Sequence, residues 1–568
     1  MAQKKQRRHK VRATLGAQAG LALDLPEISV SEVAVGPRAV HLQFEDADPR
    51  GIWVGRKPLA DHLRDTGMGW VLAVRTFMRQ RDWTQFEAAY KGGGRPAHHP
   101  AVMLSLALFG TMFGQTSLRD LETLARADVR VWWLTGGAMP DHSAIGRFIE
   151  RHTHLITESF FEDLTKAVVG LMGTPTGTIA NDATVVQAAC SRLATIKQEA
   201  AREAAAEAKA KAYAAPEDEK LATKAELAQE VLETAQKRSA ERKAKGRANT
   251  DAPVSPMEPE ARVQPMKNGQ VAPSYLACIA VDANRVITGQ KIESSSEPAA
   301  VPHLVEQSER VMGVPVTTVL GDGRYNTGEL HHLAEKKGFE LLAPASSTDQ
   351  SSQDGKHFGK ARFVFDEATN AYTCPAGEVL EPYRRHTDRD GRKVVDYQTK
   401  ADCTQCPFAN QCIRGKGNRS ILRYEHDQAK EDLAKKMTQP EVRERYSRRQ
   451  VMVEPVFAET KYIQGEVRFL RRGLRGAALE HSLHCCAHNL RRALRVKIQS
   501  TRRGAKGAGS SRAAGQRQSG SIWPEHRRIR QTPCPTIRHR GSWCLSVRVA
   551  SANRLPTARG VLAVPASV

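Results

Sequence analysis

Three acidic residues stand in contexts that suit metal-dependent chemistry. Asp322 follows the β-branched run at residues 316–320 and is bracketed by glycines, so its carboxylate lies where a strand ends and the backbone turns. Asp182 lies in a second short strand, and Glu454 lies in a helical-looking segment late in the chain. An aspartate after a strand can also simply cap the next helix. The recurrence of acids in matching contexts favours a shared site over a cap.

Such carboxylates cannot all stay ionised side by side unless cations neutralise them. Mg²⁺ prefers hard oxygen ligands of this kind. Two ions about 3.5–4 Å apart can activate a nucleophile and stabilise the leaving oxygen in phosphoryl transfer. An aspartate on one strand, an aspartate on a second strand and a glutamate on a helix form the acidic triad of an RNase H-like fold.

Positive charge is concentrated at the two ends of the chain. The formal net charge is +23, of which residues 1–12 contribute +6 and residues 501–568 contribute +12, leaving +5 for the body. A polyanionic partner is consistent with this excess, although a solvated tail accounts for the C-terminal part equally well. With 568 residues the chain is long enough for two or three domains.

The same composition argues for a chain in the cytoplasm. No apolar run reaches the length of a membrane span, and the first residues lack the apolar stretch of a secretory signal. Ten cysteines in so long a chain do not indicate a disulfide scaffold. We therefore expect reduced thiols and no membrane partner.

Four domains are predicted from the pattern along the chain. Residues 1–45 form a basic arm that we expect to be disordered, and residues 46–170 form an all-α N-terminal domain. Short helices with tight turns can read DNA as a helix-turn-helix, or can be a plain helical scaffold. Residues 171–498 are the catalytic domain, and residues 499–568 are a basic tail without periodicity that we expect to be disordered.

The catalytic domain is predicted to be an α/β fold with an RNase H-like core. Strands and helices follow one another in the order expected for that core, beginning with the Asp182 strand and ending with the Glu454 helix. A helical insertion rich in Ala, Glu and Lys occupies residues 190–248. A cysteine-rich β insertion occupies residues 345–425.

Cysteines in the second insertion have the character of a structural metal site. Cys403 and Cys406 form a Cys-x-x-Cys pair, Cys412 follows, and Cys374 lies further upstream. Four such thiols can form a structural zinc site. The alternative is four thiols in a small β subdomain, and a redox pair is less favoured because the βαβ setting is missing.

Basic and aromatic residues surround the late acid. They are Tyr446, Arg448, Arg449, Lys461, Arg468, Arg471 and Arg472. Arg and Lys beside a metal site can hold the phosphates of DNA. An exposed helix face would carry similar charge, but it would not require Glu454 and Lys461 to lie two turns apart on one face.

Taken together, these pieces resemble DDE transposases of bacterial insertion sequences, in the broad four/five superfamily and most of all in the group numbered eleven-eighty-two. The resemblance runs from about residue 95 to residue 493. It is carried in chain order by Gly94-Arg-Pro-x-x-His-Pro100, Trp133-Leu-x-Gly-Gly137, Pro140-Asp-His142, Asp182, Glu258-Pro-Glu-Ala-Arg262, Asp322-Gly-Arg-Tyr325, Cys374-Pro-x-Gly377, Cys403-x-x-Cys406-Pro407, Glu454-Pro-Val-Phe-x-x-x-Lys461, Arg472-Gly-Leu474 and Asn489-Leu490.

The resemblance implies that Asp182, Asp322 and Glu454 bind two catalytic Mg²⁺ or Mn²⁺ ions. It also implies a Tyr-Arg-Glu-Lys signature, which here falls on Tyr446, Arg449, Glu454 and Lys461. The gap from Arg449 to Glu454 is one residue longer than the family pattern, so the neighbouring Arg448 remains a candidate. Glu480 is the reserve candidate for the third acid.

The implied activity is transposition. Such an enzyme binds the terminal inverted repeats of its element, cuts the double-stranded DNA there and joins the freed 3′-hydroxyl to target DNA. Bringing two ends together implies a homodimer in the synaptic complex, working at the bacterial nucleoid. Two alternatives stay open, namely an RNase H-like nuclease that does not join strands and a catalytically inactive DNA-binding regulator.

Overall fold

The computed structural model describes residues 44, 48–90, 96–173, 175–244, 246–266, 269–345, 357–388, 391–413 and 417–507, the last thirteen by backbone alone. All of them lie in one unit, Met1–Ser511. The predicted N-terminal arm, apart from Phe44, lies outside these residues, and so do residues 508–568 of the predicted tail. The last helix runs past residue 498 to Gly507.

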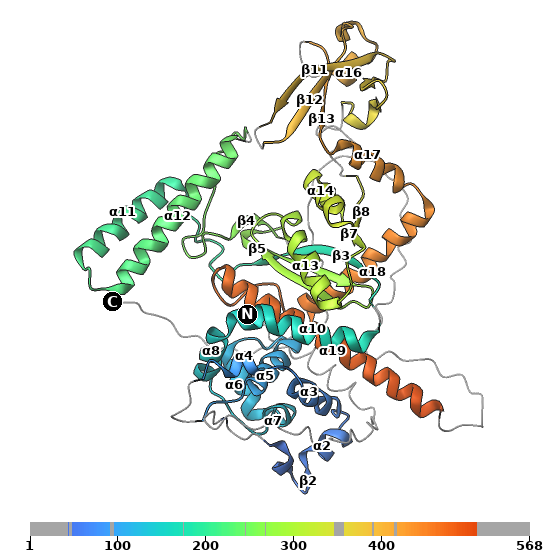
Figure 1. Cartoon of the computed structure of the whole chain (residues 1–568). Coiled ribbons are helices and arrows are strands. Elements are labelled where there is room, and N and C mark those ends of the chain that lie inside the picture. Colours follow the sequence, from blue (N-terminus) through green and yellow to red (C-terminus); the bar gives the residue numbers. More distant parts are fainter. Residues whose placement is uncertain are drawn as a thin grey trace, which may run out of the picture. The chain divides into compact units, whose positions relative to one another are not determined.

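The first part of the chain is helical, as predicted (Figure 1). After η1 (Pro49–Gly51) and the small hairpin of β1 (Trp53–Val54) and β2 (Lys57–Pro58), its elements are α2 (Leu59–Asp65), α3 (Trp70–Arg79), α4 (Thr84–Glu87), α5 (Pro100–Met112), α6 (Leu118–Ala127), α7 (Val129–Thr135), α8 (His142–Arg151), α9 (Thr153–Leu155), η2 (Ile156–Phe160) and α10 (Phe161–Met172). Every residue of α5 is buried. The apolar residues over 60–78 have the spacing of one helix, but Gly67 adopts a φ of +72° and separates α2 from α3.

A six-stranded mixed sheet follows. Its strands are β3 (Thr178–Gln187), β4 (Arg262–Pro265), β5 (Val271–Asp282), β6 (Ile287–Glu293), β7 (Thr318–Leu320) and β8 (Glu340–Leu342). They are ordered β4-β5-β3-β7-β8, and β6 also pairs with β5. Strands β4, β3 and β6 run antiparallel to β5, whereas β3, β7 and β8 are parallel. The predicted mixed α/β class is confirmed at this level.

Helices pack on this sheet and join it to the N-terminal helices. They are η3 (Pro298–Ala300), α13 (Val301–Met312), η4 (Gly323–Tyr325), α14 (Gly328–Lys337), α17 (Asp427–Lys436), α18 (Pro440–Tyr462) and α19 (Gly473–Gly507). Helix α19 contacts α5, α10 and β6. Its buried Asn489 accepts a hydrogen bond from Ile287 N and donates one to Ile287 O, both at 2.8 Å, so one amide replaces a missing partner strand at this part of β6.

The helical insertion is a pair of packed helices, α11 (Gln198–Ala214) and α12 (Glu219–Ala244). Both helices lie within the helical insertion predicted over residues 190–248, and the first begins at residue 198. Arg238 of α12 is buried and donates to the carbonyl oxygens of Pro259 and Ala261 at 2.6 and 3.1 Å. These bonds tie the insertion to the segment that leads into β4.

The cysteine-rich region holds a second, five-stranded antiparallel sheet. After η5 (Lys360–Arg362) come β9 (Val364–Asp366), β10 (Ala371–Thr373), β11 (Val379–Thr387), β12 (Lys393–Gln398), η6 (Cys403–Gln405), α16 (Ala409–Cys412) and β13 (Ser420–Tyr424). The strands are ordered β13-β12-β11-β10-β9. This sheet has its own small core, made of Phe363, Tyr372, Leu380, Tyr397, Cys412 and Ile421.

No helix among the described residues combines the length and the apolar character that a membrane span requires.

Candidate active site

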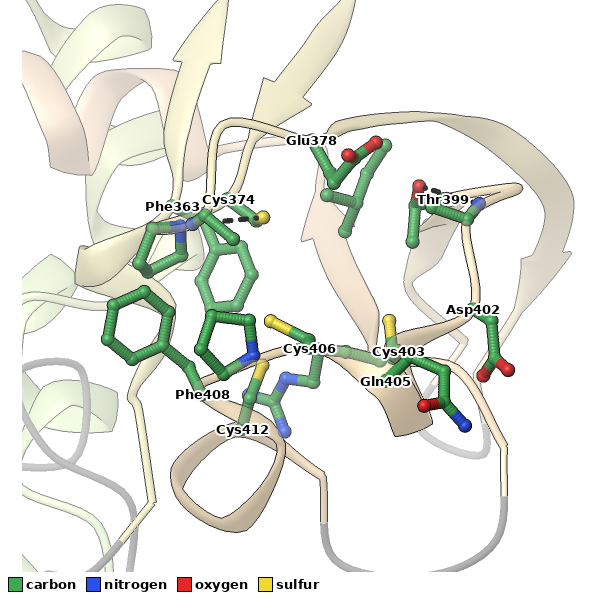
Figure 2. A pocket seen from close by; sticks show the side chains of 16 residues that line it. Phe363, Cys374, Glu378, Thr399, Asp402, Cys403, Gln405, Cys406, Phe408 and Cys412 are labelled. Carbon is green, nitrogen blue, oxygen red and sulfur yellow. Dashed lines mark hydrogen bonds between the residues drawn. The ribbon is translucent and has the colours of Figure 1, made fainter.

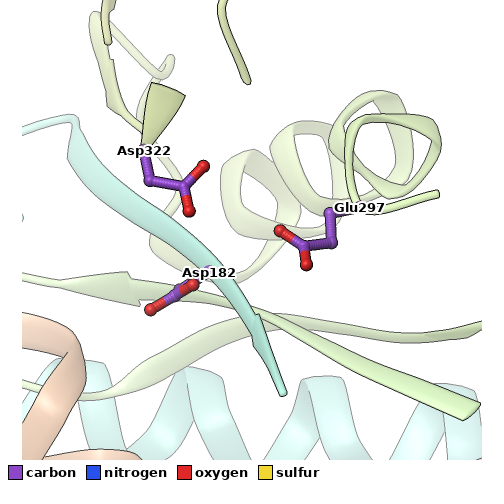
Figure 3. A group of neighbouring side chains, drawn as sticks. All are labelled: Asp182, Glu297 and Asp322. Atoms are coloured by element: carbon purple, nitrogen blue, oxygen red, sulfur yellow. The ribbon is translucent and has the colours of Figure 1, made fainter. Parts of the chain in front are cut away.

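Two of the predicted acids meet at one edge of the six-stranded sheet. Asp182 lies within β3, and Asp322 follows β7 after a single glycine. The two strands are parallel neighbours in which Ala180 pairs with Leu320, so the acids two residues further on come level with each other. Figure 3 shows both carboxylates together with that of Glu297, and oxygen atoms of all three lie within 4.8 Å of one another.

Glu297, the third acid of this group, was not predicted from the sequence. It lies after β6 and immediately before η3, and its side chain is buried. Burial raises the pKa of its carboxyl group, and the guanidinium of Arg324, whose Nη1 lies 2.5 Å from Oε1, opposes that shift. The available signal was its context, because Glu297 follows a strand as Asp322 does.

The residues around Asp322 explain why this stretch reads Gly-Asp-Gly-Arg-Tyr. Tyr325 is fully buried, and a Cβ added at Gly321 would lie 2.6 Å from the Cβ of Tyr325. Asp322 Oδ1 accepts a hydrogen bond from Arg324 N at 2.8 Å and so caps η4, while Thr327 caps α14. Capping and membership of the acidic group are therefore compatible for this aspartate.

Helix α18 brings two residues of the predicted signature to the acids. The Nη2 atom of Arg449 lies 3.1 Å from Oδ2 of Asp182. Tyr446 is half-buried one turn earlier, and this burial raises the pKa of its phenol. The side chain of Arg448 is exposed. Arg449, whose spacing departs from the family pattern, is thus the arginine that contacts the site.

Glu454 lies on the exposed side of α18. Its Oε1 accepts a hydrogen bond from Gln450 Nε2 at 2.8 Å, and its oxygens are not in the group that lies within 4.8 Å. Lys461, two turns later, donates to the carbonyl oxygen of Val185 on β3 at 3.4 Å. The role of Glu454 as third metal ligand therefore stays a prediction.

The remaining basic candidates differ in their surroundings. Arg468 is exposed and donates to Ala189 O at 2.7 Å. Arg472 is exposed, whereas Arg471 is largely buried, with its Nε 4.0 Å from Oε1 of Glu480. Glu480 accepts the backbone N–H groups of residues 470 and 471, and burial raises its pKa to about 7. Through these contacts Glu480, the reserve candidate for the third acid, stabilises the turn at residues 470 and 471.

A buried glutamate joins two of the fragments that carried the resemblance. Glu258 is fully buried and accepts hydrogen bonds from Cys190 N at 2.5 Å and Gly473 N at 2.9 Å. Its other close partner is Tyr275, whose hydroxyl lies 3.3 Å from Oε1. The carboxylate thereby connects the segment after β3, strand β5 and the start of α19.

The acidic group suits a hard divalent cation. Three carboxylates converge on one point, and oxygen is the ligand that Mg²⁺ and Mn²⁺ prefer. Asp182 and Asp322 come from adjacent parallel strands, which hold their backbones at fixed spacing. The arrangement can concentrate positive charge where a phosphodiester would react.

Two family models match the chain. One is described as a transposase DDE domain and covers residues 373–494, and the other is described as a transposase domain and covers residues 72–151. Together they indicate a DDE-type insertion-sequence transposase, which confirms the resemblance at the level of that class. The narrower group stays a prediction. No curated protein matches the chain.

Proposed function

We propose that this transposase binds the terminal inverted repeats of its element and catalyses metal-dependent DNA cleavage and strand transfer. The observation that carries the proposal is the pair of aspartates, which lie level on adjacent parallel strands with Glu297 beside them. The strand order, with three antiparallel strands followed by two parallel ones, supports an RNase H-like core for residues 171–498. The phosphoryl-transfer activity expected of the class needs such a carboxylate platform.

In this proposal Asp182, Asp322 and Glu454 hold Mg²⁺ or Mn²⁺, and Glu297 is a further acid at the same edge. Bound ions would supply Lewis acidity for an in-line displacement at phosphorus. The chain itself contributes Arg449, whose contact with Asp182 keeps a positive charge beside the carboxylates. Glu454 lies on the same helix as Arg449, so a small change in the position of α18 would move both residues together.

DNA would be held by the basic residues of α18 and of the turn that precedes α19. Arg448, Arg468 and Arg472 are exposed, and all three are well suited to phosphate contacts. The helices of residues 72–151 match a transposase domain, and we assign recognition of the terminal repeats to them. Two element ends would be paired in a homodimer at the bacterial nucleoid.

The test is a cleavage and joining assay on a labelled duplex that carries the element's end. We expect Mg²⁺- or Mn²⁺-dependent cutting by the wild-type chain, and transfer of a pre-cut 3′ end into target DNA. Asp322→Asn keeps the shape of the side chain but removes a charged ligand, and it should reduce cleavage about a thousandfold at unchanged DNA binding.

Glu293→Gln is the matched control, because Glu293 is a carboxylate of the same region that lies outside the acidic group. It should cut at nearly the wild-type rate. Cutting without joining of pre-cut ends would favour the nuclease alternative. DNA binding without any cutting in either metal would favour the inactive regulator.

A further inference from the structure

We propose that Cys374, Cys403, Cys406 and Cys412 bind one zinc ion that holds the five-stranded sheet together. The site is separate from the acidic group and does not rest on the function proposed above.

The four cysteines come from three separate segments and face one pocket (Figure 2). Cys374 follows β10, Cys403 and Cys406 belong to the turn at η6, and Cys412 ends α16. Four thiolates are the complete ligand set of a closed structural zinc site. Sulfur atoms bound to one tetrahedral zinc at 2.3 Å lie about 3.8 Å apart, and binding would draw these four to that spacing.

The turn after Cys374 directs backbone N–H groups at the cysteine, as turns that carry metal ligands do. The backbone N–H of Ala376 donates to Cys374 Sγ at 3.3 Å, and Gly377 N donates to Cys374 O at 2.9 Å. Gly377 has a φ of +88°, which closes the turn and which side chains other than glycine rarely adopt. An N–H group directed at sulfur stabilises the thiolate over the thiol, as hydrogen bonds to metal ligands generally do.

Hydrogen bonds from the Asn418 side chain and within the backbone hold the segment that carries the other three thiols. Asn418 Oδ1 accepts a hydrogen bond from Cys403 N at 3.0 Å, and its Nδ2 donates to Thr399 O at 3.1 Å. Ala409 N donates to Cys406 O at 2.9 Å, which starts the short helix that ends at Cys412. Turns on both sides of the pocket therefore position the segments that carry the four sulfurs. An ion would still have to draw the sulfurs closer together, since no three of them lie within 4.8 Å of one another.

A bound metal would also stabilise this sheet, whose hydrophobic core is small. Its buried cluster has six side chains, and one of them is Cys412. Small domains whose core is insufficient are commonly stabilised by a structural metal.

Metal content of the full chain tests the proposal. We would purify wild type under reducing conditions from zinc-supplemented medium and measure zinc by mass spectrometry. We expect about one zinc per chain. Cys406→Ser should lower the ratio at least about tenfold, whereas Cys278→Ala, which removes a buried cysteine of β5, should leave it unchanged.

A second measurement covers the case in which Cys406→Ser does not fold. Cobalt would replace zinc in the wild-type chain, and its absorption should show tetrahedral bands with thiolate charge transfer. Titration with a mercurial should then release the metal as four thiols react. Three results would overturn the proposal: no zinc in wild type, zinc retained by Cys406→Ser at the wild-type ratio, or a Cys403–Cys406 disulfide under reducing conditions.

Discussion

The acidic group and the cysteine group are held by their sheets in opposite ways. Asp182, Glu297 and Asp322 stand on a sheet whose central strand, β5, is buried from Ala272 to Asp282 and which shares a large core with many helices. The four cysteines stand on a sheet with a core of six side chains. A metal at the first sheet would serve chemistry, and a metal at the second sheet would serve folding.

The acidic group and the cysteine group also differ in the positive charge that surrounds them. The carboxylates already contact cationic side chains, since Arg449 pairs with Asp182 and Arg324 pairs with Glu297. The fold of the large sheet therefore does not depend on an ion to neutralise them. Among the described residues that line the cysteine pocket, the N–H of Ala376 and the side chain of Arg419 supply positive charge, and a structural ion would supply the rest.

The largest expected effect is that removing Mg²⁺ and removing zinc change different properties of the protein. Removing Mg²⁺ should abolish cleavage while the protection of every strand against hydrogen exchange stays unchanged. Removing zinc should lower the protection of β9–β13 about a hundredfold or more, because metal binding contributes to folding there, while β3 and β5 stay protected. Hydrogen-exchange mass spectrometry measures both. Equal loosening of the two sheets in either treatment would contradict the distinction.

A smaller effect should separate the two glutamates. Glu454→Gln should reduce cleavage about a hundredfold, as loss of a metal ligand does. Glu297→Gln should reduce it about tenfold, because Glu297 is buried against Arg324 and its amide can still accept that hydrogen bond. Single-turnover rates at saturating Mg²⁺ make the comparison. If the order is reversed, Glu297 is the third ligand and Glu454 only supports α18.

The smallest effect concerns the attachment of the small sheet. Arg423 of β13 has its guanidinium carbon 3.4 Å from the Phe365 ring centroid and donates to Tyr372 Oη and to Glu431 Oε1 of α17, both at 2.8 Å. Arg423→Met keeps the apolar stem and should destabilise this sheet by about 1–2 kcal/mol. Hydrogen exchange in β10 and β13 measures the loss.

Lys430→Met is the control for Arg423→Met, since Lys430 is a cation of α17, the helix that carries Glu431, and its Nζ lies 4.0 Å from Oδ1 of Asp427. It should leave the exchange rates unchanged. A loss of cleavage in Arg423→Met at full stability of the sheet would mean that the small sheet takes part in catalysis.

The local order of the chain was readable from its sequence. The strands that carry Asp182 and Asp322, β3 and β7, and the helix that carries Glu454, α18, were predicted, because their apolar periods act within a few residues. The break between α2 and α3 was missed, since it depends on a left-handed glycine inside a continuous apolar period.

The sequence by itself indicated the class of protein and predicted the two aspartates and the four cysteines as site residues, because each is marked by its neighbours in the chain. Only the tertiary structure placed Glu297 beside the aspartates and Arg449 against Asp182. It also placed Glu480 where its carboxylate accepts the backbone N–H of Leu470. Those contacts join segments up to hundreds of residues apart, and they depend on how β6, α18 and α19 pack on the sheet. Packing of that kind is the sum of many weak long-range contacts, which no short stretch of sequence encodes.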